Sequence, residues 1–190
     1  DRPLRAIAIT SPEHADGKTS TTIKLAAALA QTQGRTLIVD CDMRRPALHK
    51  VFGVGNETGL STLISSECTL KDAIKRTELA QIDILPSGRT PPNASDLLHS
   101  QRFIDLLAEL KRMYPLIIFD TPPLLSVTDG VVLGKQLDGV VLVARWGKTT
   151  REALRDAHRM LCSVQVRSLG VVLNDLNPKK GASYYRYRSY

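Results

Sequence analysis

The 190-residue sequence lacks long apolar runs and contains only three cysteines. Apolar stretches such as 25–30 and 139–144 are far shorter than the roughly 18 residues of a membrane-spanning helix, so no transmembrane segment is expected. Cys41, Cys68 and Cys162 have no Cys-x-x-Cys spacing, which predicts free thiols in a reducing compartment rather than disulfides or a zinc site. The first residues include neither an initiator Met nor the apolar region of a signal peptide, so we expect a piece of a longer protein.

Acidic residues are in deficit, because 19 Asp and Glu face 26 Lys and Arg, a formal net charge of +7. A basic protein of this kind favours nucleic acid or an anionic membrane as a partner. However, the last twelve residues carry four of the positive charges and no acidic residue, and the rest of the chain carries only +3. This distribution gives only weak support for a basic nucleic-acid-binding face, so no nucleic-acid partner is predicted for the body, and the C-terminal tail is a separate question.

Strand-length apolar segments alternate with segments of helical spacing, the pattern of an α/β domain with a mainly parallel central sheet. Nearly continuous apolar residues at 116–119 and 140–143 indicate strands that helices cover on both faces. The length fits one domain, predicted to be a catalytic domain over 1–176 with a flexible tyrosine-rich tail over 177–190. The predicted strands span 5–10, 36–40, 82–85, 116–120, 139–144 and 168–173, and the main predicted helices span 19–33, 95–113 and 149–161.

The first chemical motif is TSPEHADGKT at 10–19, between the first predicted strand and helix. Gly17, Lys18 and Thr19 match the second half of a P-loop, in which backbone N–H groups hold phosphate oxygens. In that motif the Lys meets the β- and γ-phosphates and the Thr hydroxyl binds Mg²⁺. Pro12 stands where the full motif has its first glycine, so this segment alone is also compatible with an ordinary turn before a helix.

Acidic residues follow two other predicted strands. The spacing of Asp40 and Asp42 points both carboxylates the same way from an extended segment, so both can approach one metal-phosphate centre. Asp120 ends the apolar run LIIF, as the Walker B acid that holds Mg²⁺ directly or through water does. A solvated turn is the alternative for the pair, and an apolar run followed by Asp is common. All three motifs in this order, each after a strand, are more specific than any one of them.

Together these motifs resemble the bacterial tyrosine kinases (BY-kinases), cytoplasmic P-loop domains of the deviant-Walker group that regulate capsule and exopolysaccharide synthesis. The similarity spans essentially the whole chain, including DCDMR at 40–44 as a Walker A′ motif, DTPP at 120–123 as Walker B, and a C-terminal tyrosine cluster. The resemblance implies ATP- and Mg²⁺-dependent autophosphorylation in which a neighbouring subunit receives the tail. The implied acceptors are Tyr184, Tyr185, Tyr187 and Tyr190, although a tail of Tyr and Arg also suits RNA binding.

The resemblance also implies individual roles. Lys18 neutralises developing charge, while Thr19, Asp42 and Asp120 hold Mg²⁺. Asp40 accepts the phenol proton, although spacing alone leaves Asp40 and Asp42 interchangeable. Asn174, at the end of the last predicted strand, is either an adenine contact or a turn residue. The implied nucleotide-binding set is Asp16, Gly17, Lys18, Thr19, Ser20 and Asn174.

Two positions depart from related patterns. Partition-type ATPases carry a signature lysine where this chain has Glu13, which favours the kinase. Family kinases usually carry glycine where this chain has Ala15, and alanine resists positive φ, which puts the backbone geometry around the β-phosphate in question. A partition-type ATPase and a non-catalytic nucleotide-dependent scaffold are the alternative functions.

Partners and location follow from the same resemblance. The implied partners are the tails of neighbouring subunits, a transmembrane and periplasmic activator segment of the parent protein, and a cognate tyrosine phosphatase. The implied location is the cytoplasmic face of the bacterial inner membrane. No Glu-x-x-Arg-x-x-Arg oligomerisation motif precedes the first strand, and Glu152, Arg155 and Arg159 have a different spacing. We therefore expect the full-length protein to form homo-oligomers and this stretch to form a ring poorly and remain monomeric.

Overall fold

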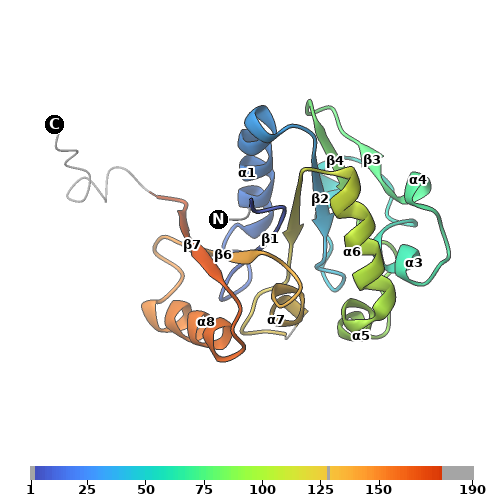
Figure 1. Ribbon diagram of the computed structural model, residues 1–190. Helices are drawn as coiled ribbons and strands as arrows, with labels where there is room; N and C mark the ends of the chain where they lie inside the picture. Colours follow the sequence, from blue (N-terminus) through green and yellow to red (C-terminus); the bar gives the residue numbers. More distant parts are fainter. Residues whose placement is uncertain (1–2, 128, 177–190) are drawn as a thin grey trace.

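The computed structural model describes residues 3–127 and 129–176, which form one sheet between two layers of helices (Figure 1). The strand order is β3-β4-β2-β5-β1-β6-β7, and every neighbouring pair is parallel except β3 with β4. The expected α/β class with a mainly parallel sheet is confirmed. The strands are β1 (Ala6–Thr10), β2 (Thr36–Asp40), β3 (Lys75–Arg76), β4 (Ile82–Leu85), β5 (Leu116–Asp120), β6 (Gly139–Arg145) and β7 (Ser168–Asn174).

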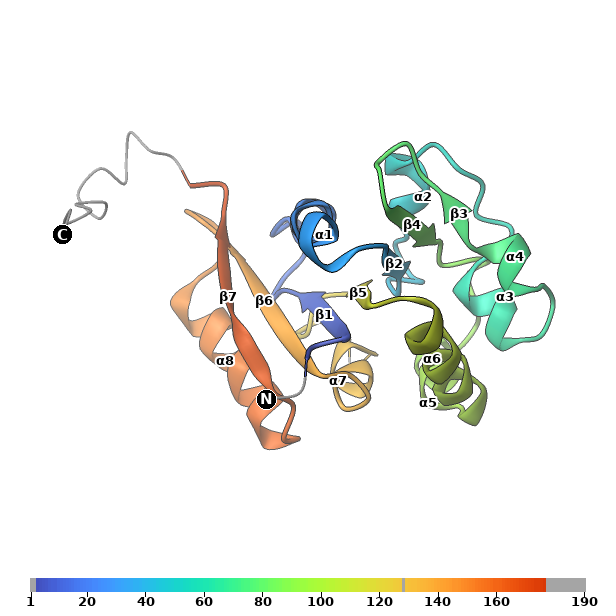
Figure 2. The ribbon, with the colours of Figure 1, turned by 45° about the horizontal axis from the view of Figure 1, so that its top comes forward.

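Helices cover both faces, and each face has its own apolar core (Figure 2). Alternate residues of β1 point to opposite cores, with Ala6 and Ala8 in one and Ile7 and Ile9 in the other. Burying a side chain such as isoleucine contributes about 1.5–3 kcal/mol, so these central strands stabilise both layers. The helices are α1 (Lys18–Gln33), α2 (Leu48–Val51), α3 (Leu60–Ile64), α4 (Leu70–Ala73), α5 (Ala94–His99), α6 (Gln101–Met113), α7 (Asp129–Gly134) and α8 (Arg151–Ser163).

One predicted helix, over 95–113, is in fact two helices that meet at Ser100. Ser100 has extended backbone angles (φ −69°, ψ 150°), and its Oγ accepts a hydrogen bond from the N–H of Phe103 at 3.2 Å. This bond caps the N-terminus of α6, since a serine at that position satisfies an amide that has no partner within the helix. Apolar spacing alone missed the break because Leu98 and Phe103 are buried on either side of it.

Replacing Ser100 by alanine is expected to lower the free energy of unfolding by about 1 kcal/mol, because the N–H of Phe103 loses its acceptor. Urea denaturation followed by circular dichroism measures the difference. Ser100→Thr keeps a hydroxyl at the cap and should stay within about 0.5 kcal/mol of the parent. Equal losses in the two variants would show that the cap has no stabilising role.

Other expectations concern membranes and cysteines. Within the described ranges, no helix combines the length and the apolar character needed to cross a membrane. All three cysteines are free, as expected, with Cys41 buried and Cys162 exposed. The sheet order has one consequence for function: β5 lies between β1 and β2, so Asp120 is the register partner of Asp40.

Candidate nucleotide site

The loop between β1 and α1 has the backbone of a phosphate-binding loop. Gly17 precedes α1 with φ 92°, and a Cβ there would lie 1.9 Å from Nδ2 of Asn174, so only glycine fits without rearrangement. The first amides of α1 have no partner within the helix and are available to an anion. Ala15 also has positive φ, at 59°, so the backbone keeps the left-handed conformation although the glycine is missing.

Thr19 and Asp120 form the centre of the site. The Thr19 hydroxyl donates to Oδ2 of Asp120 at 2.6 Å, and the Thr22 hydroxyl donates to Oδ1 at 3.4 Å. Burial raises the pKa of Asp120 to about 6, while the Thr19 hydrogen bond and the charge of Lys18 act in the opposite direction. Two of the three residues expected to bind Mg²⁺, Thr19 and Asp120, are therefore in direct contact.

Lys18 begins α1 and is buried at the same point. Burial lowers the pKa of its ammonium group, while the charges of Asp120, Asp42 and Asp16 raise it. Three carboxylates already surround Lys18 and more than balance its charge. Lys18 can therefore neutralise an incoming phosphate only if a cation or hydrogen-bond donors also bind these carboxylates. The site therefore suits a nucleotide that arrives with a divalent cation.

Asp40 and Asp42 occupy different environments. Asp40 is fully buried, and its Oδ1 accepts from the Asp42 amide at 3.1 Å. Its Oδ2 accepts from the amides of Ala47 and Leu48, both at 3.0 Å, at the start of α2. Burial and the neighbouring Asp120 raise the pKa of Asp40 to about 7, although these backbone hydrogen bonds lower it. Asp42 is partly exposed, so it is the member of the pair that faces solvent.

Arg44, from the same loop, pairs with a buried acid that the sequence did not single out. Its Nε lies 3.2 Å from Oδ2 of Asp129, which is almost fully buried at the start of α7 and also accepts from the hydroxyl of Ser95. The loop after β2 is thereby tied to α5 and α7.

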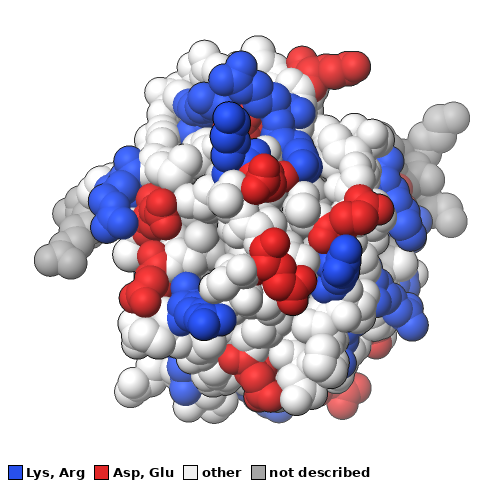
Figure 3. Space-filling view, turned by 90° about the vertical axis from the view of Figure 1, so that its right-hand side faces the viewer, with Lys and Arg blue, Asp and Glu red and all other residues white. Residues whose placement is uncertain are grey.

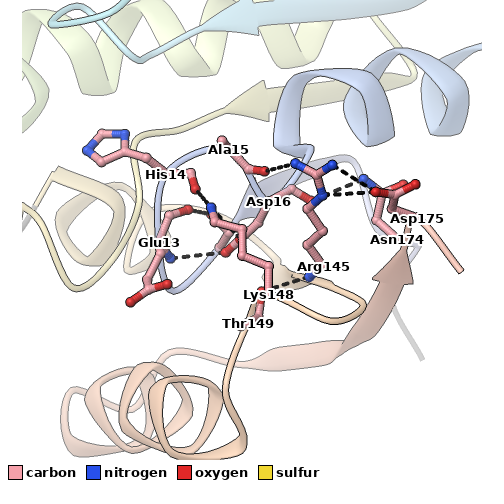
Figure 4. Close-up of polar contacts among 10 residues, drawn as sticks. Glu13, His14, Ala15, Asp16, Arg145, Lys148, Thr149, Asn174 and Asp175 are labelled. Atoms are coloured by element: carbon pink, nitrogen blue, oxygen red, sulfur yellow. Dashed lines mark hydrogen bonds and ion pairs between the residues drawn. The ribbon is translucent and has the colours of Figure 1, made fainter.

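Three side chains at the ends of β6 and β7 contact the phosphate-binding loop (Figure 4). Lys148 Nζ donates to the His14 carbonyl, Arg145 Nη1 to the Ala15 carbonyl at 3.3 Å, and Asn174 Nδ2 to the Asp16 carbonyl at 3.1 Å. Arg145 and Lys148 were not predicted from the sequence. The available signal was a cation at the end of β6 and a second one three residues later, because β6 is the strand beside β1.

Asp16 and Ser20 were expected to bind nucleotide, and their side chains face the loop itself. The buried Asp16 carboxylate accepts from the Glu13 amide at 3.1 Å and pairs with Lys148 at 3.3 Å. The hydroxyl of Ser20, which is exposed, donates to the Gly17 carbonyl at 2.9 Å. The Asp16 carboxylate is therefore held by the loop and by Lys148.

Comparison with known proteins identifies the family. A family model described as an AAA domain matches residues 4–167. The putative tyrosine-protein kinase CapB of Staphylococcus aureus is 36% identical over 187 residues, covering 98% of this chain and 82% of CapB. The chain belongs to the bacterial tyrosine-protein kinase family. The resemblance seen in the sequence is thus confirmed.

Solved structures of BY-kinases share the whole fold. The crystal structure of the chimerical protein CapA2B2 superposes with a TM-score of 0.90 at 37% identity, covering 93% of this chain and 78% of that one. The kinase domain of the Escherichia coli tyrosine kinase ETK gives a TM-score of 0.87 at 34% identity, covering 91% and 68% of the two chains. The expected P-loop NTPase fold is therefore confirmed.

The tyrosines of this BY-kinase domain fall into two groups. Tyr184, Tyr185, Tyr187 and Tyr190, the expected acceptors, lie outside the described residues, as does the whole predicted tail. The fifth, Tyr114, is buried and donates its hydroxyl to Asp83 at 2.7 Å. Burial, followed by this hydrogen bond, raises the pKa of Tyr114. A buried, hydrogen-bonded phenol cannot reach the nucleotide site, so Tyr114 is not an acceptor in the folded domain.

Proposed function

We propose that this domain transfers the γ-phosphoryl group of ATP to tyrosines of its own C-terminal segment and thereby regulates capsule or exopolysaccharide synthesis and export. The observation that carries the proposal is the convergence of Lys18, Thr19, Asp42 and Asp120 at one phosphate-binding loop. Membership of a family whose relatives are named tyrosine-protein kinases supports tyrosine as the acceptor.

The reaction is an in-line displacement at the γ-phosphorus. A bond forms between the tyrosine Oη and this phosphorus, the bond from the phosphorus to the oxygen shared with the β-phosphate breaks, and ADP leaves. The backbone amides at the start of α1 bind phosphate oxygens, and Lys18 neutralises charge on the phosphates. The acceptor proton moves to a carboxylate of the site, because a phenol with a pKa near 10 stays protonated until it reacts.

The residues present fit Mg²⁺. Thr19 and Asp120 are in contact and Asp42 lies close by, and hydroxyl and carboxylate oxygens are the ligands that Mg²⁺ prefers. Within the described part of the chain, His, Cys, Asp and Glu side chains do not gather in threes or more as a metal site made of protein ligands alone would need. This agrees with a cation that is bound by one or two carboxylates together with substrate phosphates. When bound, Mg²⁺ would supply charge neutralisation on those phosphates.

The choice of proton acceptor depends on how accessible a carboxylate is to the phenol and on how basic it is. The raised pKa of Asp40, about 7, suits a base, but both of its oxygens are held by backbone amides and it is fully buried. Geometry comes before pKa in choosing a base, so we propose that Asp42 accepts the phenol proton and that Asp40 positions the loop. This moves the base from Asp40, where the family resemblance placed it, to Asp42, an alternative that the spacing of the pair left open. Thr19 and Asp120 are then the residues that would hold Mg²⁺.

The proposed partners are those that the family implies: tails of neighbouring subunits in a homo-oligomer, a transmembrane and periplasmic activator segment, and a cognate phosphatase at the cytoplasmic face of the inner membrane. The proposal includes no nucleic acid. On the face seen in Figure 3, basic side chains gather at the top, and acidic and basic side chains are mixed over the rest.

The decisive experiment places the intact nucleotide site and the acceptor tyrosines on different molecules. One chain carries Lys18→Met and an intact tail; the other keeps Lys18 and carries Tyr→Phe at 184, 185, 187 and 190. After mixing with ATP and Mg²⁺, intact-mass spectrometry should show phosphate added only to the Lys18→Met chain, by transfer between molecules. If the parent chain is phosphorylated but neither chain of this mixture is, transfer occurs only within one molecule. ATP hydrolysis without any added mass would favour the positioning ATPase.

A further inference from the structure

Three consecutive carbonyl groups of the phosphate-binding loop, those of His14, Ala15 and Asp16, each accept a hydrogen bond from one side chain at the ends of β6 and β7. We propose that these three side chains, Arg145, Lys148 and Asn174, form a carbonyl clamp that holds the loop in its nucleotide-binding conformation, with Lys148 as the main positioning residue. The inference rests on the proposed binding of nucleotide at this loop.

The loop needs such support because of Ala15. Its φ of 59° lies in the left-handed region, which alanine populates rarely and glycine populates readily. Backbone in a sparsely populated region persists only where the surrounding structure fixes it. The clamp bonds the carbonyl of Ala15 and those on both sides of it, so it acts on the residues where the backbone is least favourable.

Lys148 contributes more than a single hydrogen bond. Its ammonium group contacts the His14 carbonyl and also pairs with Oδ1 of Asp16 at 3.3 Å, while the other carboxylate oxygen of Asp16 accepts from the Glu13 amide. Asp16 is fully buried, whereas the Lys148 side chain is 39% exposed. One cation therefore links the backbone and a buried carboxylate of the loop to the turn between β6 and α8.

The turn that carries Lys148 is itself well held. The Arg145 amide donates to Oγ1 of Thr149 at 2.7 Å, and the Trp146 amide donates to the Asn174 carbonyl at 2.9 Å. The Arg145 guanidinium pairs with Asp175 at 2.8 Å (Figure 4). Since β6 lies beside β1 and β7 beside β6, with all three parallel, their carboxyl ends meet at the same edge of the sheet. The clamp can therefore resist movement of the loop.

Functionally, the clamp sets the fraction of molecules whose loop is ready to bind phosphate. The apparent dissociation constant for nucleotide equals the intrinsic constant divided by this fraction. Without Lys148, Ala15 is free to leave the left-handed region, and the fraction falls. A glycine at the same position would remain in that region more often, so its dependence on the clamp should be smaller.

The test measures binding of ADP with Mg²⁺ by calorimetry. Lys148→Met should raise the dissociation constant about tenfold, while kcat at saturating ATP stays within about threefold, because the clamp affects loop population and not the transfer step. Lys148→Arg, which retains a cationic donor, should recover most of the affinity. Lys135→Met, which removes an exposed lysine of the loop after α7, is the matched control and should bind as the parent does.

A double-mutant cycle separates this role from general stabilisation. In the Ala15→Gly background, Lys148→Met should raise the dissociation constant by less than about threefold, since neighbouring residues that share a function are not additive. An equal loss of nucleotide affinity in the parent and in the Ala15→Gly background, or no loss in either, would refute the carbonyl clamp. If Lys148→Met fails to fold, Lys148→Gln, which keeps a neutral donor, takes its place in the cycle. Absence of nucleotide binding by the parent chain would instead refute the proposed function.

Discussion

Replacing Lys18 by methionine is expected to reduce tyrosine phosphorylation about 100-fold or more. Methionine keeps the length and apolar stem of the buried side chain but removes the cation that faces the phosphates and the acids Asp42 and Asp120. Charged groups that stabilise a transition state in a site protected from water typically contribute effects of about this size. Phosphate incorporation over time, followed by intact-mass spectrometry, gives the rate.

Lys24→Met is the matched control for this variant, because Lys24 lies on the same helix, α1, and is exposed. It should phosphorylate at the parent rate. Circular dichroism would establish that both variants are folded. A folded Lys18→Met protein that works as fast as the parent would exclude this loop as the site of transfer.

Replacing Asp120 by asparagine is expected to remove activity to a similar extent and yet to raise the free energy of unfolding, in the absence of Mg²⁺, by roughly 3 kcal/mol. The carboxylate is buried, and burial raises its pKa from the ordinary 3.8 to about 6, so the native state holds an unfavourable charge. Asparagine has nearly the same shape and can still hydrogen-bond to Thr19. Urea denaturation and the mass assay together measure the two effects.

The pH dependence of this gain has a definite sign. A carboxyl whose pKa is higher in the native than in the unfolded protein binds more proton in the native state, so stability falls as pH rises through the interval between 3.8 and about 6. The advantage of Asp120→Asn should therefore be largest near pH 8 and shrink towards about pH 4. An advantage that grew as the pH fell would contradict the assigned cause.

Local sequence patterns were sufficient for the class of fold and the identity of the main motifs. The apolar runs at 116–119 and 140–143 predicted buried parallel strands because a strand covered on both faces needs apolar residues at every position. Gly17, Lys18 and Thr19 could be recognised because a phosphate-binding turn is made from adjacent residues. The break at Ser100 was missed, since apolar spacing continues across it and only the cap to Phe103 distinguishes two helices from one.

The difference in burial between Asp40 and Asp42 could be seen only in the structure. Their spacing placed both carboxylates after β2, but the amides of Ala47 and Leu48, contributed by the start of α2, hold Asp40 below the surface. A two-residue spacing in an extended segment predicts a common direction and says nothing about what later residues fold over it. Burial therefore separated two residues that the sequence treated as equivalent.

The fold class, the P-loop and the three acids could be predicted from local patterns, because each depends on neighbouring residues and on the end of one strand. Which distant residues contact them depends on the packing of the whole domain. Placing β5 between β1 and β2 sets Asp120 beside Asp40, and placing β6 next to β1 brings Lys148 onto Asp16 across more than a hundred residues of chain. Strand order is fixed by how helices and strands pack together, and no local pattern records it.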